Sequence, residues 1–277
     1  MEPVYNESSL ETDTEFGELY RYTELIGTAL SLIGIVANIL IITTILSSKS
    51  LQTRTYLLLL NWSIFNILFR LTSDNLLHVM LINMEINVEM ICVTMNLDTM
   101  FRFAEMVFLL ALISNWVLKS YKISDLVILL IFYATITSSL LVVTSLCMLD
   151  IETELIYALG GVTYLCLLIN VIIKNANRFC KAKGDPLSPE TVKRLNLASI
   201  YTLWTIASFI VMLSAYIFGI FIFIQISAMS TFLIPLIFIL YLSKVDQTFK
   251  CSFLALINCR RLPDNPTENN NECCNNP

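Results

Sequence analysis

The chain alternates seven long apolar stretches with short polar connectors. Each stretch holds about 20 mainly apolar residues, the length that an α-helix needs to cross a hydrocarbon core about 30 Å thick. The pattern therefore predicts an all-α protein, a seven-transmembrane helix bundle over residues 25–242. The expected spans are 25–46, 56–80, 97–120, 126–149, 155–173, 195–217 and 220–242.

Basic residues are confined to alternate connectors. Of the 17 Lys and Arg, all but Arg21, Arg70 and Arg102 lie in or beside the first, third and fifth connectors or in the tail. The segment 1–24 and the second and fourth connectors are acidic instead. Because short loops rich in Lys and Arg remain in the cytoplasm, we expect 1–24 to be extracellular and the tail 259–277 to be cytoplasmic.

Composition supports a membrane protein. The chain is 56% hydrophobic and 14% charged, with a mean hydropathy of +0.73. A soluble domain of this length could not cover so much apolar surface. The spans also leave no room for a second folded domain. The net charge of −5 averages an acidic outer side and a basic inner side. It gives no support for a nucleic-acid partner, and the expected surrounding is the lipid bilayer of the plasma membrane.

A shorter amphipathic helix is expected at 243–258, after a break at Ser243. Val245, Phe249 and Phe253 recur every four residues and form an apolar stripe. Such a helix lies along the membrane surface. Cys259 follows it and is a candidate for palmitoylation, with a free thiol as the alternative. At the other end, Asn6 begins a glycosylation sequon on the expected outer side.

Four ionisable side chains lie inside the second and third spans, away from the ends of each span. Such groups are costly in lipid, and they normally pair or face a cavity. Because the two helices run antiparallel, we expect Arg70 to meet Glu105 and Arg102 to meet Asp74. One interpretation is a structural ion-pair cluster. The other is the lining of a polar ligand pocket, which would include Asp74, Arg102, Glu105 and two residues near the outer mouth, His78 and Asp98.

Short motifs in the first two spans carry a family resemblance. Gly34 and Asn38-Ile-Leu40 are similar to a Gly-Asn-x-Leu stretch, and 49–63 is similar to a basic Leu-x-Thr stretch running into Leu-x-Asn-Leu-Ala/Ser around Asn61. Both stretches are typical of rhodopsin-like (class A) G-protein-coupled receptors, which the chain resembles as a divergent member. Pro235 occupies the place of the proline in the family's Asn-Pro-x-x-Tyr motif. Asn66 stands where the family usually has Asp.

The resemblance also shows departures. Val117 stands where the family has the arginine of Asp-Arg-Tyr, and the sixth span lacks Cys-Trp-x-Pro, with Phe209 as the nearest aromatic residue. The family's disulfide implies a bridge between Cys92 and Cys147. The usual sodium ligands and a retinal lysine are missing, so we expect no metal and no cofactor. A seven-span metal hydrolase would need several His or Asp ligands, and the chain has one His, so we expect no enzyme activity.

The resemblance implies a receptor that senses an extracellular ligand and activates a heterotrimeric G protein. Its expected G-protein face contains Val117 and four basic residues, Lys181, Lys183, Lys193 and Arg194. The segment 188–194 is also similar to vomeronasal and bitter-taste-type receptors, which implies a chemosensory role. The missing arginine leaves open a non-signalling or decoy seven-span protein. A transporter is a further alternative, although the internal repeats common in transporters are absent from the sequence.

Overall fold

The structure is a computed structural model that describes residues 7–72, 88–113, 125–149, 154–180, 188–220 and 229–258. All regular secondary structure in these residues is helical, which confirms the all-α class. The elements are α1 (Glu7–Ser47), η1 (Lys49–Leu51), α2 (Arg54–Thr72), α4 (Val88–Ile113), α6 (Asp125–Met148), α7 (Glu154–Cys180), α8 (Pro189–Ile217), η3 (Thr231–Leu233), α10 (Ile234–Val245) and α11 (Gln247–Ile257).

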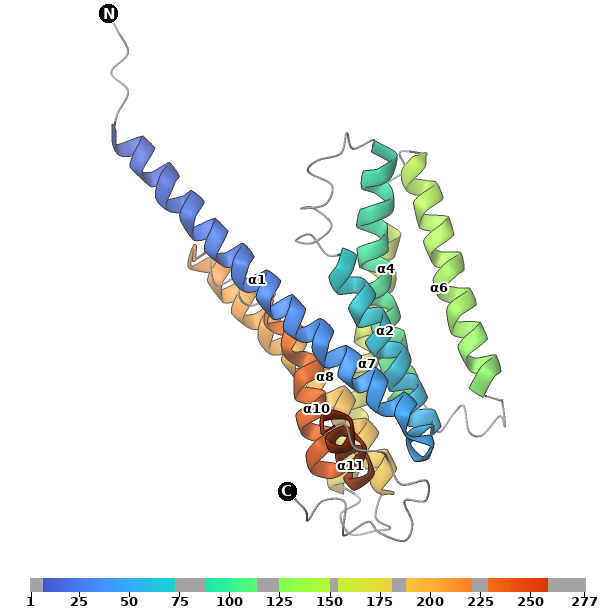
Figure 1. Cartoon of the computed structure of the whole chain (residues 1–277). Helices are drawn as coiled ribbons and strands as arrows, with labels where there is room; N and C mark the ends of the chain where they lie inside the picture. Colours follow the sequence, from blue (N-terminus) through green and yellow to red (C-terminus); the bar gives the residue numbers. More distant parts are fainter. Residues whose placement is uncertain are drawn as a thin grey trace, which may run out of the picture.

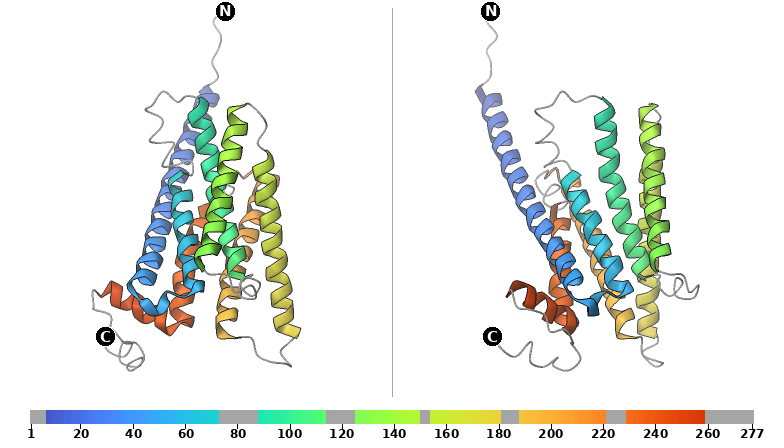
Figure 2. Two further views of the ribbon diagram at one scale, coloured as in Figure 1. Left: turned by 90° about the vertical axis from the view of Figure 1, so that its right-hand side faces the viewer. Right: turned by 45° about the vertical axis from the view of Figure 1, so that its right-hand side comes forward.

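The long helices form a bundle around α4 (Figure 1). α4 packs against α2, α6, α7 and α8, and α1 packs against α2, α10 and α11. α6 lies at the edge of the bundle away from α1 (Figure 2). It exposes apolar side chains along its length. The core is built from Phe and Leu of α2, α4 and α10 together with Ala37, Ile41 and Ile45 of α1.

Three described helical segments are long and apolar enough to cross a membrane. They are Leu25–Ser47, Leu129–Met148 and Pro189–Ile217. The pair formed by Thr231–Val245 and Gln247–Ile257 is bent by 116° and makes a fourth if it is counted as one span. The exposed face of these helices is apolar, which is the surface that lipid requires. The chain therefore has the character of a helical membrane protein.

Several helices extend beyond the predicted spans. α1 begins at Glu7 instead of near residue 25, because no proline interrupts the segment and acidic side chains suit the first turns of a helix. α8 begins at Pro189, where Ser188 is the N-cap and accepts a hydrogen bond from the Thr191 N–H. Together with α7, which continues to Cys180, this makes most of the predicted fifth loop helical.

The break before the last helix lies at Asp246, and Ser243 belongs to α10. The Asp246 side chain accepts a hydrogen bond from the Phe249 N–H at 3.1 Å and so caps α11. α11 then crosses one end of the bundle, which is called the base below (Figure 1). Phe249 is fully buried there, stacked between Tyr56 and Phe253 with ring centroids 6.1 Å from each. The predicted amphipathic helix therefore packs its apolar side against the bundle.

Candidate functional site

A buried polar core joins α1, α2 and α4 in the middle of the bundle. The Asn38 amide donates to the Asn66 Oδ1 at 2.7 Å, and the Asn66 amide donates to the Glu105 Oε1 at 2.9 Å. Arg70 Nε donates to the same Asn66 oxygen at 2.7 Å. All four residues are buried, with exposed fractions between 0% and 4%. Asn66 is thus the centre of this network.

Arg70 extends the polar core to the beginning of α10. Its Nη2 donates to the Phe232 carbonyl oxygen at 2.9 Å, and its guanidinium carbon lies 4.7 Å from the centre of the Phe232 ring. Pro235, at the start of α10, has no N–H with which to continue the helix from η3. Arg70 therefore donates a hydrogen bond to the Phe232 carbonyl at the irregular junction between η3 and α10.

Gly34 provides the space for the Arg70 side chain. A Cβ atom at residue 34 would lie 2.6 Å from the Phe232 carbonyl oxygen and 2.5 Å from the guanidinium carbon of Arg70. Ordinary carbon contacts lie at about 3.5–4.0 Å. Only glycine fits between these groups without a shift of the backbone, so the Gly34–Asn38 stretch serves Arg70 as well as helix packing.

Of the two predicted charge pairs, Arg70 with Glu105 and Arg102 with Asp74, only the first lies wholly within the described residues. Arg70 and Glu105 come together, with Asn66 bonded to both. Arg102 lies against the Phe69 ring, 3.9 Å from its centre to the guanidinium carbon. Its expected partner Asp74 lies outside the described residues, and so does His78. Asp98 is half-buried on α4, one helical turn from Arg102.

The other predicted residues are dispersed. The Asn61 Oδ1 accepts a hydrogen bond from the Tyr133 hydroxyl at 2.6 Å and links α2 to α6. Phe209 is 56% exposed on α8 and faces away from the core, whereas Trp204 donates from Nε1 to the Ser230 carbonyl at 3.0 Å. Cys147 is not a free thiol. The side chain of Cys92 lies outside the described part of the chain, so the bridge between them stays a prediction. The remaining predicted residues, Asn6, Val117, Lys181, Lys183 and Cys259, also lie outside it.

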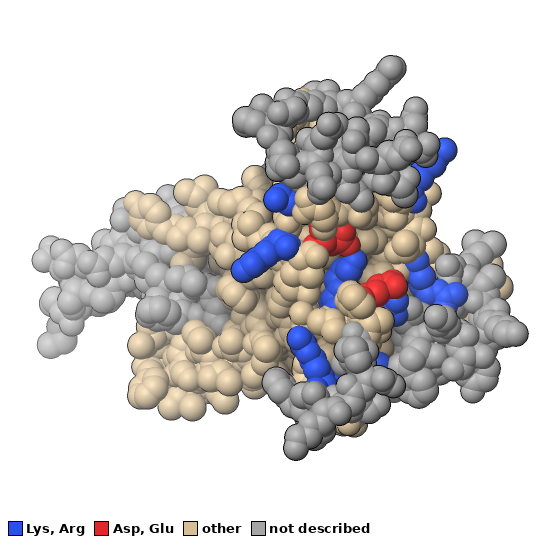
Figure 3. Space-filling model, turned by 90° about the horizontal axis from the view of Figure 1, so that it is seen from below, with Lys and Arg blue, Asp and Glu red and all other residues tan. Residues whose placement is uncertain are grey.

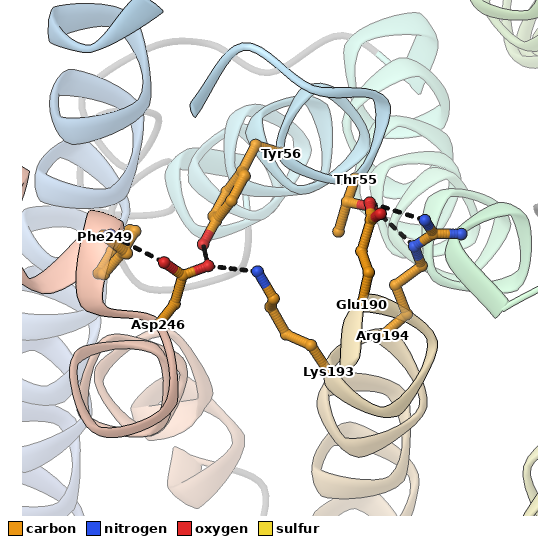
Figure 4. Close-up of polar contacts among 7 residues, drawn as sticks. All are labelled: Thr55, Tyr56, Glu190, Lys193, Arg194, Asp246 and Phe249. Atoms are coloured by element: carbon orange, nitrogen blue, oxygen red, sulfur yellow. Dashed lines mark hydrogen bonds and ion pairs between the residues drawn. The ribbon is translucent and has the colours of Figure 1, made fainter. Parts of the chain in front are cut away.

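A second polar cluster lies at the base, where α2, α8 and α11 meet (Figure 4). This base cluster consists of Thr55, Tyr56, Glu190, Lys193, Arg194 and Asp246. The Asp246 Oδ2 accepts from the Tyr56 hydroxyl at 2.6 Å and forms an ion pair with Lys193. Asp246 and Lys193 have side chains only 12% and 15% exposed, so the pair is well shielded from solvent. One carboxylate therefore holds three helices together.

The other half of the base cluster joins α8 to the first turn of α2. The Thr55 hydroxyl donates to Glu190 Oε1 at 2.6 Å and accepts from Arg194 Nε at 2.7 Å. Arg194 also pairs with Glu190 at 2.7 Å, one helical turn away on α8. Viewed from below, acidic side chains lie in the middle of the base, with basic ones around them (Figure 3).

Both carboxylates of the base cluster are held in the charged form. The hydrogen bond from Thr55 lowers the pKa of Glu190, and Arg194 reinforces the shift against the opposing effect of burial. Burial would raise the pKa of Asp246, but hydrogen bonds from Lys193, Tyr56 and the Phe249 N–H outweigh it and lower that pKa. Both carboxylates are therefore ionised at neutral pH.

Further polar contacts at the base tie the remaining helices to α8 and α4. Asn175 of α7 donates to the Ser199 hydroxyl at 3.0 Å. Asn196 of α8 donates to the Tyr241 hydroxyl of α10 at 2.8 Å. Lys174 of α7 donates to the Ile113 carbonyl at the end of α4. The base is thus closed by side chains from α2, α7, α8, α10 and α11 and by the last backbone carbonyl of α4.

Sequence reasoning identified Lys193 and Arg194 but did not identify the partners that hold them. Two local signals pointed to these partners. Glu190 and Arg194 are spaced one helical turn apart, and Asp246 precedes an amphipathic stretch as an N-cap residue does. The pairing of Asp246 with Tyr56 spans 190 residues and has no such local signal.

Comparison with known proteins adds no relative. No protein-family model matches the chain, and no curated protein matches it in sequence.

Proposed function

We propose that this chain is a seven-span plasma-membrane receptor, similar to rhodopsin-like G-protein-coupled receptors. It senses an extracellular ligand and activates a heterotrimeric G protein by a change of conformation. The observation that carries the proposal is the hydrogen bond between Asn38, which is part of the resemblance in the first span, and Asn66, which stands where the family usually has Asp. Both are buried, and their bond links α1 to α2 as an interior contact of such a bundle would.

The burial of charge supports a membrane location for the less apolar helices. Arg70 and Glu105, on α2 and α4, are 1% and 0% exposed. Their charges face the interior of the bundle, so neither helix has to present them to lipid. The exposed apolar surfaces of α6 and α8 complete a lipid-facing exterior. Seven spans with the N-terminus outside are consistent with these features and with the basic base.

A ligand on the outer side would act by binding one conformation more tightly than another. The polar core lies between the expected ligand side and the base, and Arg70 connects it to the start of α10. A shift in the polar core would therefore reach α10 and, through Asp246 at its end, the base. Lys193 and Arg194 would be part of the surface offered to the G protein.

The test is surface expression followed by G-protein activation. A tag before residue 1 should be accessible to antibody on intact cells, and a tag after residue 277 only after permeabilisation. A panel of chimeric G proteins then reports basal and ligand-dependent activity for the parent and for Asn38→Ala. Good surface expression with a flat signal across a broad ligand screen would contradict coupling and favour the non-signalling alternative. Uptake or current in the same cells would favour a transporter.

A further inference from the structure

We infer that Arg102 and Tyr201 form an anion site in the half of the bundle away from the base, and that its ligand is a small carboxylic acid with an apolar body. The inference rests on the proposed function for the role of this ligand as a signal. Its binding half stands on the contacts of Arg102 and Tyr201 alone, and it can be tested without a signalling assay.

The two guanidinium groups in the middle of the bundle have different surroundings. Arg70 is fully buried and donates from Nε and Nη2 to Asn66 and to the Phe232 carbonyl. Arg102 is half-buried, and its guanidinium lies against the Phe69 ring. Within the part of the chain that the structure describes, Arg102 forms no ion pair. An aromatic ring covers one face of a guanidinium and leaves the N–H donors at its edge available to an acceptor.

The charges around Arg102 leave a place for an anion. Arg70 and Arg102 both attract the Glu105 carboxylate and repel each other. Asn66 joins that carboxylate to Arg70, so two cations share one fully buried anion. Asp98, half-buried one helical turn further from the base, forms no ion pair with Arg102. Because a cation inside a membrane protein normally meets an anion, the guanidinium of Arg102 favours a negatively charged ligand.

Tyr201 of α8 places a second donor beside Arg102. Its hydroxyl interacts electrostatically with both Arg102 and Glu105. Tyr201 is only 1% exposed, and its oxygen makes no hydrogen bond with the described residues. The Trp62 ring packs edge-on against the Tyr201 ring, with centroids 6.5 Å apart, and holds it in position. Since a buried hydroxyl normally has a hydrogen-bond partner, an acceptor atom bound at Arg102 would also satisfy Tyr201.

These donors suit a carboxylate better than other anions. A guanidinium edge presents parallel N–H donors, and a planar carboxylate accepts two of them at once. The Tyr201 hydroxyl can donate to the same group. A phosphate monoester carries a charge of about −1.5 to −2 at neutral pH, which is more than the single cation of Arg102 can balance. The Phe69 and Trp62 rings next to these two residues favour a ligand whose remaining part is apolar.

Four variants isolate the site. Arg102→Gln removes the charge, and Arg102→Lys keeps the charge but not the paired donors. Tyr201→Phe removes the hydroxyl and keeps the ring that packs against Trp62. Asp98→Asn removes a carboxylate that would repel the anion. Arg178→Gln is the matched control, because it removes an arginine from an exposed position near the end of α7.

Thermal unfolding of the purified full-length protein measures binding directly. The probes are straight-chain acids from acetate to octanoate, together with benzoate and phenylacetate, each compared with its primary amide. At least one acid should raise the unfolding midpoint of the parent, and its amide should not. Arg102→Gln should bind this acid roughly tenfold to a hundredfold more weakly, and Tyr201→Phe about tenfold more weakly, the factors for losing hydrogen bonds to a charged group. Arg102→Lys should be intermediate. Asp98→Asn and Arg178→Gln should bind at least as tightly as the parent.

Two results would overturn the inference. The first is that no acid stabilises the parent, or that an acid stabilises Arg102→Gln equally well. The second is an internal partner for Arg102: Arg102→Gln and Asp98→Asn would each destabilise the protein without ligand, and the double variant would be no less stable than either. The same comparison with Asp74→Asn tests the predicted partner that lies outside the described residues.

G-protein activation by the same acid separates this inference from the proposed function. Activation of the parent but not of Arg102→Gln, at equal surface expression, supports both. Binding that depends on Arg102, with no activation by the bound acid or any other ligand, supports the anion site and contradicts the receptor function. Activation by an uncharged or cationic ligand to which Arg102→Gln responds as the parent does would overturn the anion site and support the receptor function.

Discussion

Replacing Gly34 by alanine should destabilise the protein although alanine is the better helix former. The added Cβ would lie 2.6 Å from the Phe232 carbonyl oxygen, a backbone atom, and 2.5 Å from the guanidinium carbon of Arg70. Both separations fall short of ordinary contact by roughly 1 Å. Because Arg70 is only 1% exposed, its guanidinium has no solvent-facing space to move into.

The cost can be bracketed. Overpacking of a filled interior costs about 1–3 kcal/mol, and a buried charge that loses its partners costs about 3–5 kcal/mol. Alanine gains about 0.5–1 kcal/mol over glycine within a helix. If α1 shifts and Arg70 keeps its bonds, we expect a net loss of about 1–2 kcal/mol. If the guanidinium is displaced from Asn66, the loss should approach 4 kcal/mol.

Gly160→Ala is the matched control. Gly160 lies within α7, and nothing lies within 4 Å of a Cβ atom placed there. This substitution should be neutral or stabilising by about 0.5–1 kcal/mol. The two variants should therefore differ by at least about 1 kcal/mol, or about 2–4 °C in the midpoint of thermal unfolding of the detergent-purified protein.

A second arm assigns the cause. In the background of Arg70→Met, which removes the guanidinium, Gly34→Ala should cost less than in the parent, because only the contact with the Phe232 carbonyl remains. An equal cost in both backgrounds would mean that Arg70 does not set the requirement for glycine. A Gly34→Ala variant as stable as Gly160→Ala would refute the reasoning altogether.

Four other predictions follow from the polar core, the base cluster and the outer side. Glu105→Gln keeps the acceptor for Asn66 but leaves the guanidinium groups of the polar core without a buried anion, so thermal unfolding should show a loss of about 3–5 kcal/mol. Asp246→Asn should cost about 1–2 kcal/mol. Because the pKa of Asp246 is lowered in the folded state, this cost should be constant from about pH 5 to 8 and shrink only below about pH 4; a cost that vanishes by pH 6 would contradict an ionised Asp246. Glycosidase treatment should shift the mobility of the parent on a gel but not that of Asn6→Gln, and an unshifted parent would argue against use of the sequon. Cys92→Ser and Cys147→Ser should each lower stability by about 2–5 kcal/mol with no further loss in the double variant, and mass spectrometry of unreduced peptides should find the two cysteines joined.

The polar core could be predicted in part because membrane helices leave few choices. An ionisable side chain within a span must find a partner, and antiparallel neighbours limit which one it finds. That reasoning brought Arg70 and Glu105 together. It did not place Asn66 between them or assign Gly34 to Arg70, because both depend on how deeply α1 packs against α2, which hydrophobic periodicity does not determine.

The base cluster was harder to predict for a different reason. Its residues lie near helix ends, and the sequence pattern placed most of those ends several residues away from where they fall. With the break expected at Ser243, Asp246 belonged to the interior of an amphipathic helix; in the structure it is the N-cap of α11. Glu190 and Lys193 were treated as loop residues, although α8 already begins at Pro189. Errors of a few residues at helix ends therefore concealed this cluster.

The two polar sites are connected by a short and irregular part of the chain. Arg70 bonds to Phe232 in η3, α10 runs from Ile234 to Val245, and Asp246 follows directly. The irregular start of α10, where Pro235 interrupts backbone hydrogen bonding, is a place where the helix can bend at low cost. A rotation of α10 about this point would alter the position of Asp246 relative to Lys193 and Tyr56. The polar core and the base cluster are therefore connected by one helix of twelve residues, so that a displacement at one polar site can be transmitted to the other.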